Sequence, residues 1–259
     1  MEGIKIRFIL FSVSVFVFAG LHLHGQQTVY DEPTILFSNS LHGGIHAHPR
    51  GWGLNVHRGF IQTVDRTTYL SFEMLGMKHP KEIKSFSARS NDAKGYAYGK
   101  LNSFYMMRPS IGWKRMITDK LRKNGIELSV NTAIGPTFGI TKPTYLEIAR
   151  SLEGSSIPTL VVERYDPDIH PQNIIFGRAS FFNGFNELQL WPGIHGKLSL
   201  YVETSPYQRQ LKGVETGVLL DAFLEEVPIM ATEQNKQFFF SFFVNLFIGQ
   251  RYNRSITEE

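Results

Sequence analysis

Between Glu127 and Ile140 the sequence alternates between two kinds of side chain with a period of two. One set is mostly apolar and the other is polar or small: Leu128, Val130, Thr132, Ile134, Pro136, Phe138 and Ile140, against Glu127, Ser129, Asn131, Ala133, Gly135, Thr137 and Gly139. This alternation lasts longer than strands of soluble proteins usually do. A strand of about 10 residues, tilted near 45°, crosses a hydrocarbon layer about 30 Å thick. The pattern predicts a membrane-spanning strand.

The same alternation recurs along the chain in eight candidate strands: 34–46, 52–64, 68–78, 100–114, 127–140, 193–204, 213–223 and 237–250. The links after the second, fourth and sixth strands are short, and the links after the third, fifth and seventh are longer and polar. Bacterial outer-membrane barrels have short periplasmic turns and longer extracellular loops. We therefore predict an all-β fold, an eight-stranded antiparallel up-and-down transmembrane β-barrel with long extracellular loops and both termini in the periplasm.

Aromatic residues also fit this fold, because they recur where strands are expected to leave the lipid: Trp52, Tyr69, Trp113, Trp191, Tyr201 and Tyr252. We interpret them as interfacial girdles. Pro109 and Pro136 are placed toward strand ends, where the missing backbone donor is tolerated.

The N-terminus has Lys5 and Arg7, an apolar run from Phe8 to Ala19, and then small and polar residues to Gly25. This order predicts a cleaved signal peptide at residues 1–25 and a single barrel domain at 26–259. The alternative, a membrane anchor, needs a longer apolar run. The chain has no cysteine, so disulfides and thiolate metal sites are excluded.

A soluble secreted sandwich or lipocalin-like barrel is the alternative fold, since such folds also alternate. The polar face here carries Glu, Arg, Lys and His, which do not make a dry core. The mean hydropathy is only −0.15 despite 21 phenylalanines, as expected when alternation hides the membrane face. Lys and Arg number 27 against 23 Asp and Glu. With no basic stripe or phosphate loop, we expect no nucleic-acid partner.

Several short motifs resemble a poorly characterised group of Bacteroidetes-type outer-membrane β-barrel proteins of the PorT-like kind. They are Met77–Glu82 (MKHPKE), Tyr98–Asn102 (YGKLN), Gly135-Pro136, Lys142–Leu146 (KPTYL), Gly177–Ala179 (GRA), Leu219–Phe223 (LLDAF), Pro228–Ala231 (PIMA) and Gly249–Tyr252 (GQRY). The resemblance implies a location in the Gram-negative envelope and supplies no catalytic residues to carry over.

Residues expected to face the lumen supply the candidate sites. His42 and His46 share a parity, and His57 is expected across the hairpin, so converging imidazoles would bind a metal such as zinc; the alternative is ordinary hydrogen-bonded lumen residues. We also expect a lumen charge network of Glu73, Arg108, Lys197, Glu215 and Asp221 that fills the narrow interior. An openable gate between Glu73 and Arg108 is the alternative.

Two weaker chemical possibilities remain. Ser40, His42 and Glu73 offer the residue types of a lipid A-modifying enzyme, but the expected register points Ser40 and His42 into the lumen, away from lipid. The loop Glu163–His170 gathers acids that favour calcium, or else forms a solvated acidic loop. We predict no cofactor.

The longest link, residues 142–191, is read as an irregular loop that contains an apolar segment from Ile174 to Phe185. We predict that Phe181, Phe182 and Phe185 dock a partner protein; the alternative is that they cap the barrel itself. The resulting functional hypothesis is a non-enzymatic scaffold or accessory subunit of an envelope complex for secretion, outer-membrane protein assembly or uptake. Its expected surroundings are outer-membrane lipid, lipopolysaccharide and other envelope proteins. The alternative is a small transport or ligand-binding barrel.

Overall fold

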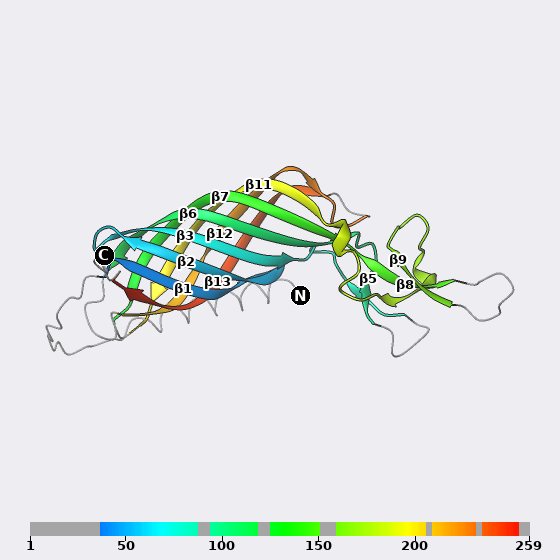
Figure 1. Cartoon of the computed structure of the whole chain (residues 1–259), viewed down its shortest axis with the longest axis horizontal. Coiled ribbons are helices and arrows are strands. Elements are labelled where there is room, and N and C mark those ends of the chain that lie inside the picture. Colours follow the sequence, from blue (N-terminus) through cyan, green and yellow to red (C-terminus); the bar gives the residue numbers. More distant parts are fainter. Residues whose placement is uncertain are drawn as a thin grey trace, which may run out of the picture. The chain divides into compact units, whose positions relative to one another are not determined.

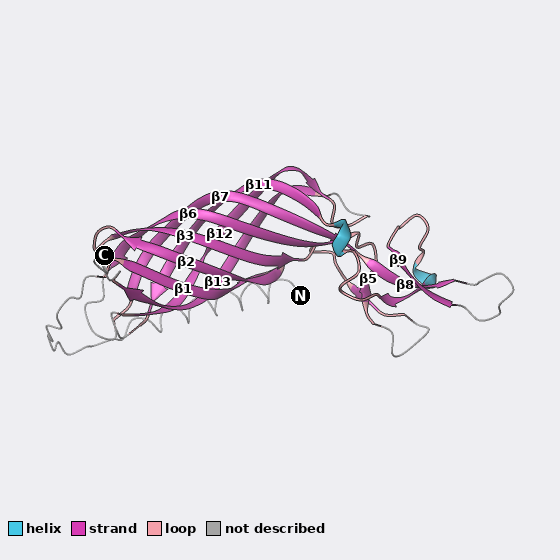
Figure 2. Cartoon of the chain, viewed as in Figure 1, coloured by secondary structure: helices cyan, strands magenta, loops and turns pink. Residues whose placement is uncertain are grey.

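The computed structural model describes residues 37–87, 94–118, 125–150, 159–205, 209–231 and 235–253. Eight antiparallel strands close a barrel in the order β1-β13-β12-β11-β7-β6-β3-β2, which confirms the predicted fold class (Figures 1 and 2). Their bounds are β1 Asn39–His48, β2 Gly51–Ile61, β3 Arg66–Met77, β6 Asn102–Thr118, β7 Glu127–Pro143, β11 Gln189–Glu203, β12 Gln210–Val227 and β13 Lys236–Tyr252. Residues 1–25, the predicted signal peptide, lie outside the described residues.

The alternation in the sequence becomes the two sides of the barrel wall. On β7, Ile134 and Phe138 point outward and are exposed, whereas Ala133 and Thr137 are buried inside. On β13, Phe238, Phe240 and Phe242 are exposed, and the residues between them line the interior. An apolar exterior around a polar interior is the arrangement of a barrel that stands in lipid.

Helices are nearly absent from the part of the chain that the structure describes. They are the 3-10 turns η1, Gln172–Ile174, and η2, Phe185–Glu187. No helix among the described residues is both long and apolar enough to cross a membrane.

The two ends of the barrel differ in their connections. At one end, β2 turns into β3 through residues 62–65, β6 ends at Thr118 and β7 begins at Glu127, and β11 ends at Glu203 and β12 begins at Gln210. Both ends of the described chain also lie here, where the Ser38 amide donates to Asn253 Oδ1 at 2.8 Å. We call this the short-turn end. At the other end, the long-loop end, lie the tight β1–β2 turn and the described parts of the segments 78–101, 144–188 and 228–235.

The 142–191 link is not an irregular loop, and that part of the prediction is wrong. It folds into a three-stranded antiparallel sheet in the order β10-β8-β9, made of β8 Tyr145–Arg150, β9 Thr159–Arg164 and β10 Ile175–Arg178. Its buried side packs Leu146, Ile148 and Ile175 against Tyr96 and Tyr165. The link 78–101 likewise pairs β4 Lys84–Ser85 with β5 Tyr96–Ala97.

Pro109 and Pro136 lie inside β6 and β7 and not toward their ends, which corrects the predicted placement. The β6–β7 register runs through Met107–Phe138 and resumes at Ile111–Ile134, so the two prolines face each other in the interruption. Neither proline has an N–H to donate. Both strands keep their second neighbour, since Pro109 pairs with Phe72 of β3 and Pro136 with Ile194 of β11.

Candidate functional site

The centre of the lumen holds a buried cluster of ion pairs contributed by β3, β6, β11 and β12. Nε and Nη2 of Arg108 donate to the Asp221 carboxylate at 2.8 and 2.5 Å, and Nη1 lies 3.7 Å from Glu73. Nζ of Lys197 lies 2.8 Å from Glu73 and 3.3 Å from Glu215. The structure therefore brings all five residues of the predicted charge network into contact, each almost fully buried.

The cluster has two cations and three carboxylates, so neutral donors complete it. Glu215 accepts hydrogen bonds from Ser199 Oγ at 2.6 Å, Asn245 Nδ2 at 3.1 Å and Asn131 Nδ2 at 3.4 Å. Asp221 also accepts one from Thr137 Oγ1 at 3.1 Å. Buried ions are tolerated when partners and hydrogen bonds surround them. This cluster is built to fill space and to stay paired.

A second charge cluster closes the lumen toward the short-turn end. Arg251 donates to Glu203 at 2.7 and 3.0 Å and to Glu127 at 3.3 Å, and Nζ of Lys114 lies 2.7 Å from Glu127. The predicted last strand ends at Gln250, so Arg251 was not among the residues expected in the lumen. Extending the parity of Phe243 and Phe247 by two steps would have found it.

Aromatic rings fill the level between the two charge clusters. Tyr201 stacks on Phe247 with ring centroids 4.2 Å apart, and Nζ of Lys114 lies 4.0 Å from the Tyr201 centroid. Tyr201 and Tyr69 are buried in the lumen, and Trp191 packs against the interior apolar cluster. Placing these three in the interfacial girdles was wrong, because their parity is that of the inward-facing residues. Trp52 and Trp113 are exposed on the outer wall.

An apolar plug closes the lumen at the long-loop end. Strand residues contribute most of it, and the segment after β12 adds two side chains: Leu75, Met77, Phe104, Met106, Phe223, Val227, Ile229, Met230 and Phe239. The Ile229 carbonyl accepts from the amides of Leu101 and Asn102 at 3.0 and 3.2 Å, which holds that segment in place. Ile229 and Met230, and not the phenylalanines of 181–185, therefore cap the barrel.

The candidate metal ligands lie in the lumen but do not converge. His42 stacks on His57 with ring centroids 4.8 Å apart, whereas His46 stacks on Phe243 at 4.7 Å. Within the described ranges no group of three or more His, Cys, Asp or Glu residues is arranged to hold a metal ion. Shared parity brought His42 and His57 together, but it does not control where each ring turns.

The other chemical candidates also take structural contacts. Glu73, required as the acid of a lipid A enzyme, is bound by Lys197 and Arg108, and the rings beside His42 are His57, Tyr201 and Phe247. In the acidic loop, Glu163 pairs with Arg150 at 2.6 Å and with His170 at 3.0 Å. The hydrogen bond from Arg150 keeps the pKa of the Glu163 carboxyl below its usual value, and the bond from His170 adds to this.

Phe181, Phe182 and Phe185 form one exposed cluster, with ring centroids 5.4 to 6.2 Å apart. Their exposed fractions are 51%, 78% and 44%. Gly184 turns the chain with a φ of +85°, where a side chain would be strained and would meet the Tyr145 ring. Nζ of Lys142 lies 5.2 Å from the Phe181 centroid and donates to the Asn183 carbonyl at 2.9 Å. The cluster is therefore fixed to the end of β7. We call it the phenylalanine cluster.

No protein-family profile matches the chain, and no curated protein matches it. Among solved structures it is similar to Ail, the attachment invasion locus protein of Yersinia pestis, with 10% identity, 84% of this chain and 100% of that chain covered, and a TM-score of 0.41. It is also similar to the N-terminal β-barrel domain of Pseudomonas aeruginosa OprF, with 7% identity, 83% of this chain and 98% of that chain covered, and a TM-score of 0.35. A third similar structure is Neisserial surface protein A, with 8% identity, 83% of this chain and 94% of that chain covered, and a TM-score of 0.35. Such distant likenesses carry no functional argument, and the barrel assignment rests on the strand ladders.

Proposed function

We propose that this chain is a non-enzymatic outer-membrane barrel whose lumen is closed and whose working surface is the structure at the long-loop end. It would serve as a scaffold or accessory subunit of an envelope complex. The apolar exterior and the signal-peptide pattern of residues 1–25 support export and insertion, with both termini in the periplasm and the long-loop end outside. Membership of the PorT-like group remains a prediction.

The observation that carries the proposal is the filled lumen. Two ion-pair clusters, a ring layer and an apolar plug follow one another along the interior. An eight-stranded barrel has an interior only wide enough for its side chains. A transport role would need several buried ion pairs to open, and breaking one buried pair costs about 3–5 kcal/mol. A role in binding at the surface needs no such change.

The long-loop end supplies a surface suited to a protein partner. The β10-β8-β9 sheet is an ordered structure, and the phenylalanine cluster exposes three rings beside it. Aromatic side chains are enriched in the cores of protein interfaces, and clusters of them often carry most of the binding energy. We therefore assign partner docking to Phe181, Phe182 and Phe185, as the sequence predicts.

Replacing Phe181, Phe182 and Phe185 together with Ser tests the assignment. The proposal expects a barrel that still inserts and keeps its heat-modifiable mobility in gels but loses the envelope proteins that co-purify after gentle detergent extraction. The matched control replaces Ile83, Phe86 and Ile169 with Ser, because these residues are exposed in the same group of loops. Loss of partners from the control as well, or their retention by the Phe variant, would contradict the docking role.

A further inference from the structure

The wall of the barrel is lowered at one point on the long-loop end. The β1–β13 register ends at Ala47–Val244, yet β13 continues back to Lys236. On the other side of the turn, the first residues of β2 pair with β3 near Met77. The Lys78 amide donates to the Arg50 carbonyl at 2.8 Å. The short β1–β2 hairpin therefore leaves a depression between β13 and the end of β3. We call it the rim notch.

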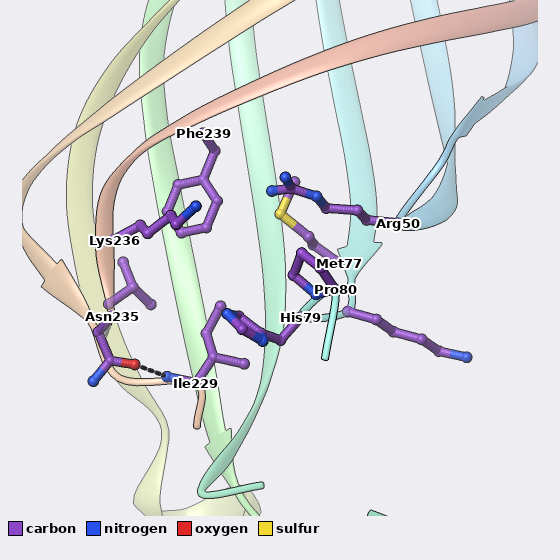
Figure 3. A pocket seen from close by; sticks show the side chains of 10 residues that line it. Arg50, Met77, His79, Pro80, Ile229, Asn235, Lys236 and Phe239 are labelled. Atoms are coloured by element: carbon purple, nitrogen blue, oxygen red, sulfur yellow. Dashed lines mark hydrogen bonds between the residues drawn. The ribbon is translucent and has the colours of Figure 1, made fainter. Parts of the chain in front are cut away.

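The rim notch has an apolar floor and a basic rim (Figure 3). The floor consists of Met77, Val227, Ile229 and Phe239, which are buried members of the apolar plug, and Arg50, Lys78 and Lys236 belong to the lining. Pro80, His79 and Asn235 complete the lining. Asn235 Oδ1 accepts from the Ile229 amide at 3.0 Å, so its oxygen is already used. Among the residues that the structure describes, no carboxylate lines the notch.

Some basic residues of the long-loop end are paired with carboxylates. Lys100 lies 2.7 Å from Glu82, Arg150 lies 2.6 Å from Glu163, and Arg164 lies 3.0 Å from Glu187. Arg50, Lys78 and Lys236 form no ion pair with any residue that the structure describes. Three like charges around one depression favour an anionic ligand.

The position of Arg50 is fixed by the backbone around it. Gly51 approaches β3 so closely that a Cβ there would lie 2.0 Å from the Gly76 carbonyl oxygen. The Arg50 amide donates to His48 Nδ1 at 3.4 Å. The turn that carries Arg50 is therefore held against the wall, and the basic rim is a built feature of the fold.

The notch lies beside the edge of the apolar exterior. Trp52 follows the turn and is 67% exposed on the outer wall, where Trp marks the membrane interface. Phe238 and Phe240 continue the apolar exterior up to Lys236. A ligand here meets the cations of the notch and, on the outer wall beside it, the edge of the apolar exterior. This combination suits the phosphate group and upper acyl chain of one molecule.

We infer that the rim notch binds the phosphate-bearing headgroup of a lipid in the leaflet at the long-loop end. The inference rests on the proposed function, because the barrel must stand in a membrane. It adds a lipid site made by Arg50, Lys78 and Lys236 that is separate from the phenylalanine cluster.

The test measures lipid A bound to the full chain in phosphatidylcholine nanodiscs, with native mass spectrometry as the readout. Arg50→Gln, Lys78→Gln and Lys236→Gln are combined in one variant. A basic residue near a charged membrane surface contributes roughly a fivefold factor, so the variant should bind on the order of a hundredfold less lipid A. The matched control combines Arg58→Gln, Arg115→Gln and Lys212→Gln, which remove exposed cations near the short-turn end, and should bind as the wild type does.

Two further arms identify what is bound. Dephosphorylated lipid A should bind weakly, and inorganic phosphate should not displace intact lipid A. Equal binding by the rim variant and the wild type would overturn the site, and full displacement by inorganic phosphate would overturn the lipid assignment. Gel heat-modifiability is measured in parallel. A chain that inserts but binds no lipid A contradicts only this inference, whereas a chain that fails to insert contradicts the proposed function.

Discussion

At the scale of single residues, Arg108 has the most consequential environment in the barrel. Its guanidinium is buried and joins Asp221 and Glu73, which come from different strands. A guanidinium presents a planar fork that matches a carboxylate with two parallel hydrogen bonds. Removing it leaves the Asp221 carboxylate without its cation, whereas Glu73 keeps Lys197 at 2.8 Å.

Arg108→Met should therefore lower the free energy of unfolding by about 3–5 kcal/mol, the usual effect of breaking a buried ion pair. The measurement is a urea titration of the refolded barrel in detergent micelles. Arg108→Met combined with Asp221→Leu should recover much of that loss, because the double variant no longer buries the Asp221 carboxylate without its cation and Glu73 still pairs with Lys197. A single variant as stable as the wild type would show that the pair does not hold the strands together.

At the scale of elements, the alternation in the sequence predicted which side of the barrel wall each strand residue faces. The lipid-facing parity of β7 and β13 follows from side chains pointing to opposite sides of a strand, and the structure has eight barrel strands at the predicted places. Parity alone does not decide the depth of a residue or the direction of its ring. His46 was therefore grouped with His42 although their rings do not meet. Tyr69 and Tyr201 were assigned to the girdle because of their residue type, although their parity places them inside the barrel.

The elements that sequence reasoning missed lack a repeated signal. β8 and β9 have six residues each and β10 has four, too short for alternation to separate them from a loop. Their buried side depends on contacts with Tyr165, which directly follows β9, and with Tyr96, which lies far from all three strands in the sequence. The centre of the lumen could be predicted because its residues share one parity, but which charges meet depends on the register across the closed barrel.

Depth within β7 gives a sharp test of the membrane assignment. Ile134 and Ile126 have similar exposed fractions, 54% and 57%, but Ile134 is inside β7 and Ile126 precedes it at the short-turn end. An outward Arg costs about 2–4 kcal/mol at the bilayer midplane and about 0–1 kcal/mol near the interface. Ile134→Arg should strongly reduce the heat-modifiable barrel recovered from membranes, and Ile126→Arg should not. Equal recovery of the two variants would contradict the predicted lipid depth of β7.

At the scale of the whole molecule, the interior and the exterior have separate tasks. Paired charges, stacked rings and the apolar plug stabilise the barrel from inside. The proposed contacts with other molecules lie at the long-loop end, at the phenylalanine cluster and the rim notch. Such a molecule needs no passage through its lumen, because its proposed contacts with other molecules lie at one end of the barrel.

Electrical recording of the purified barrel in planar bilayers tests this account most directly. With insertion verified by heat-modifiability, the account predicts no steady or stepwise current from the wild type, because paired side chains fill an interior that is already narrow. Stable stepwise currents that scale with the amount of inserted protein would contradict the closed lumen and would make transport the better assignment.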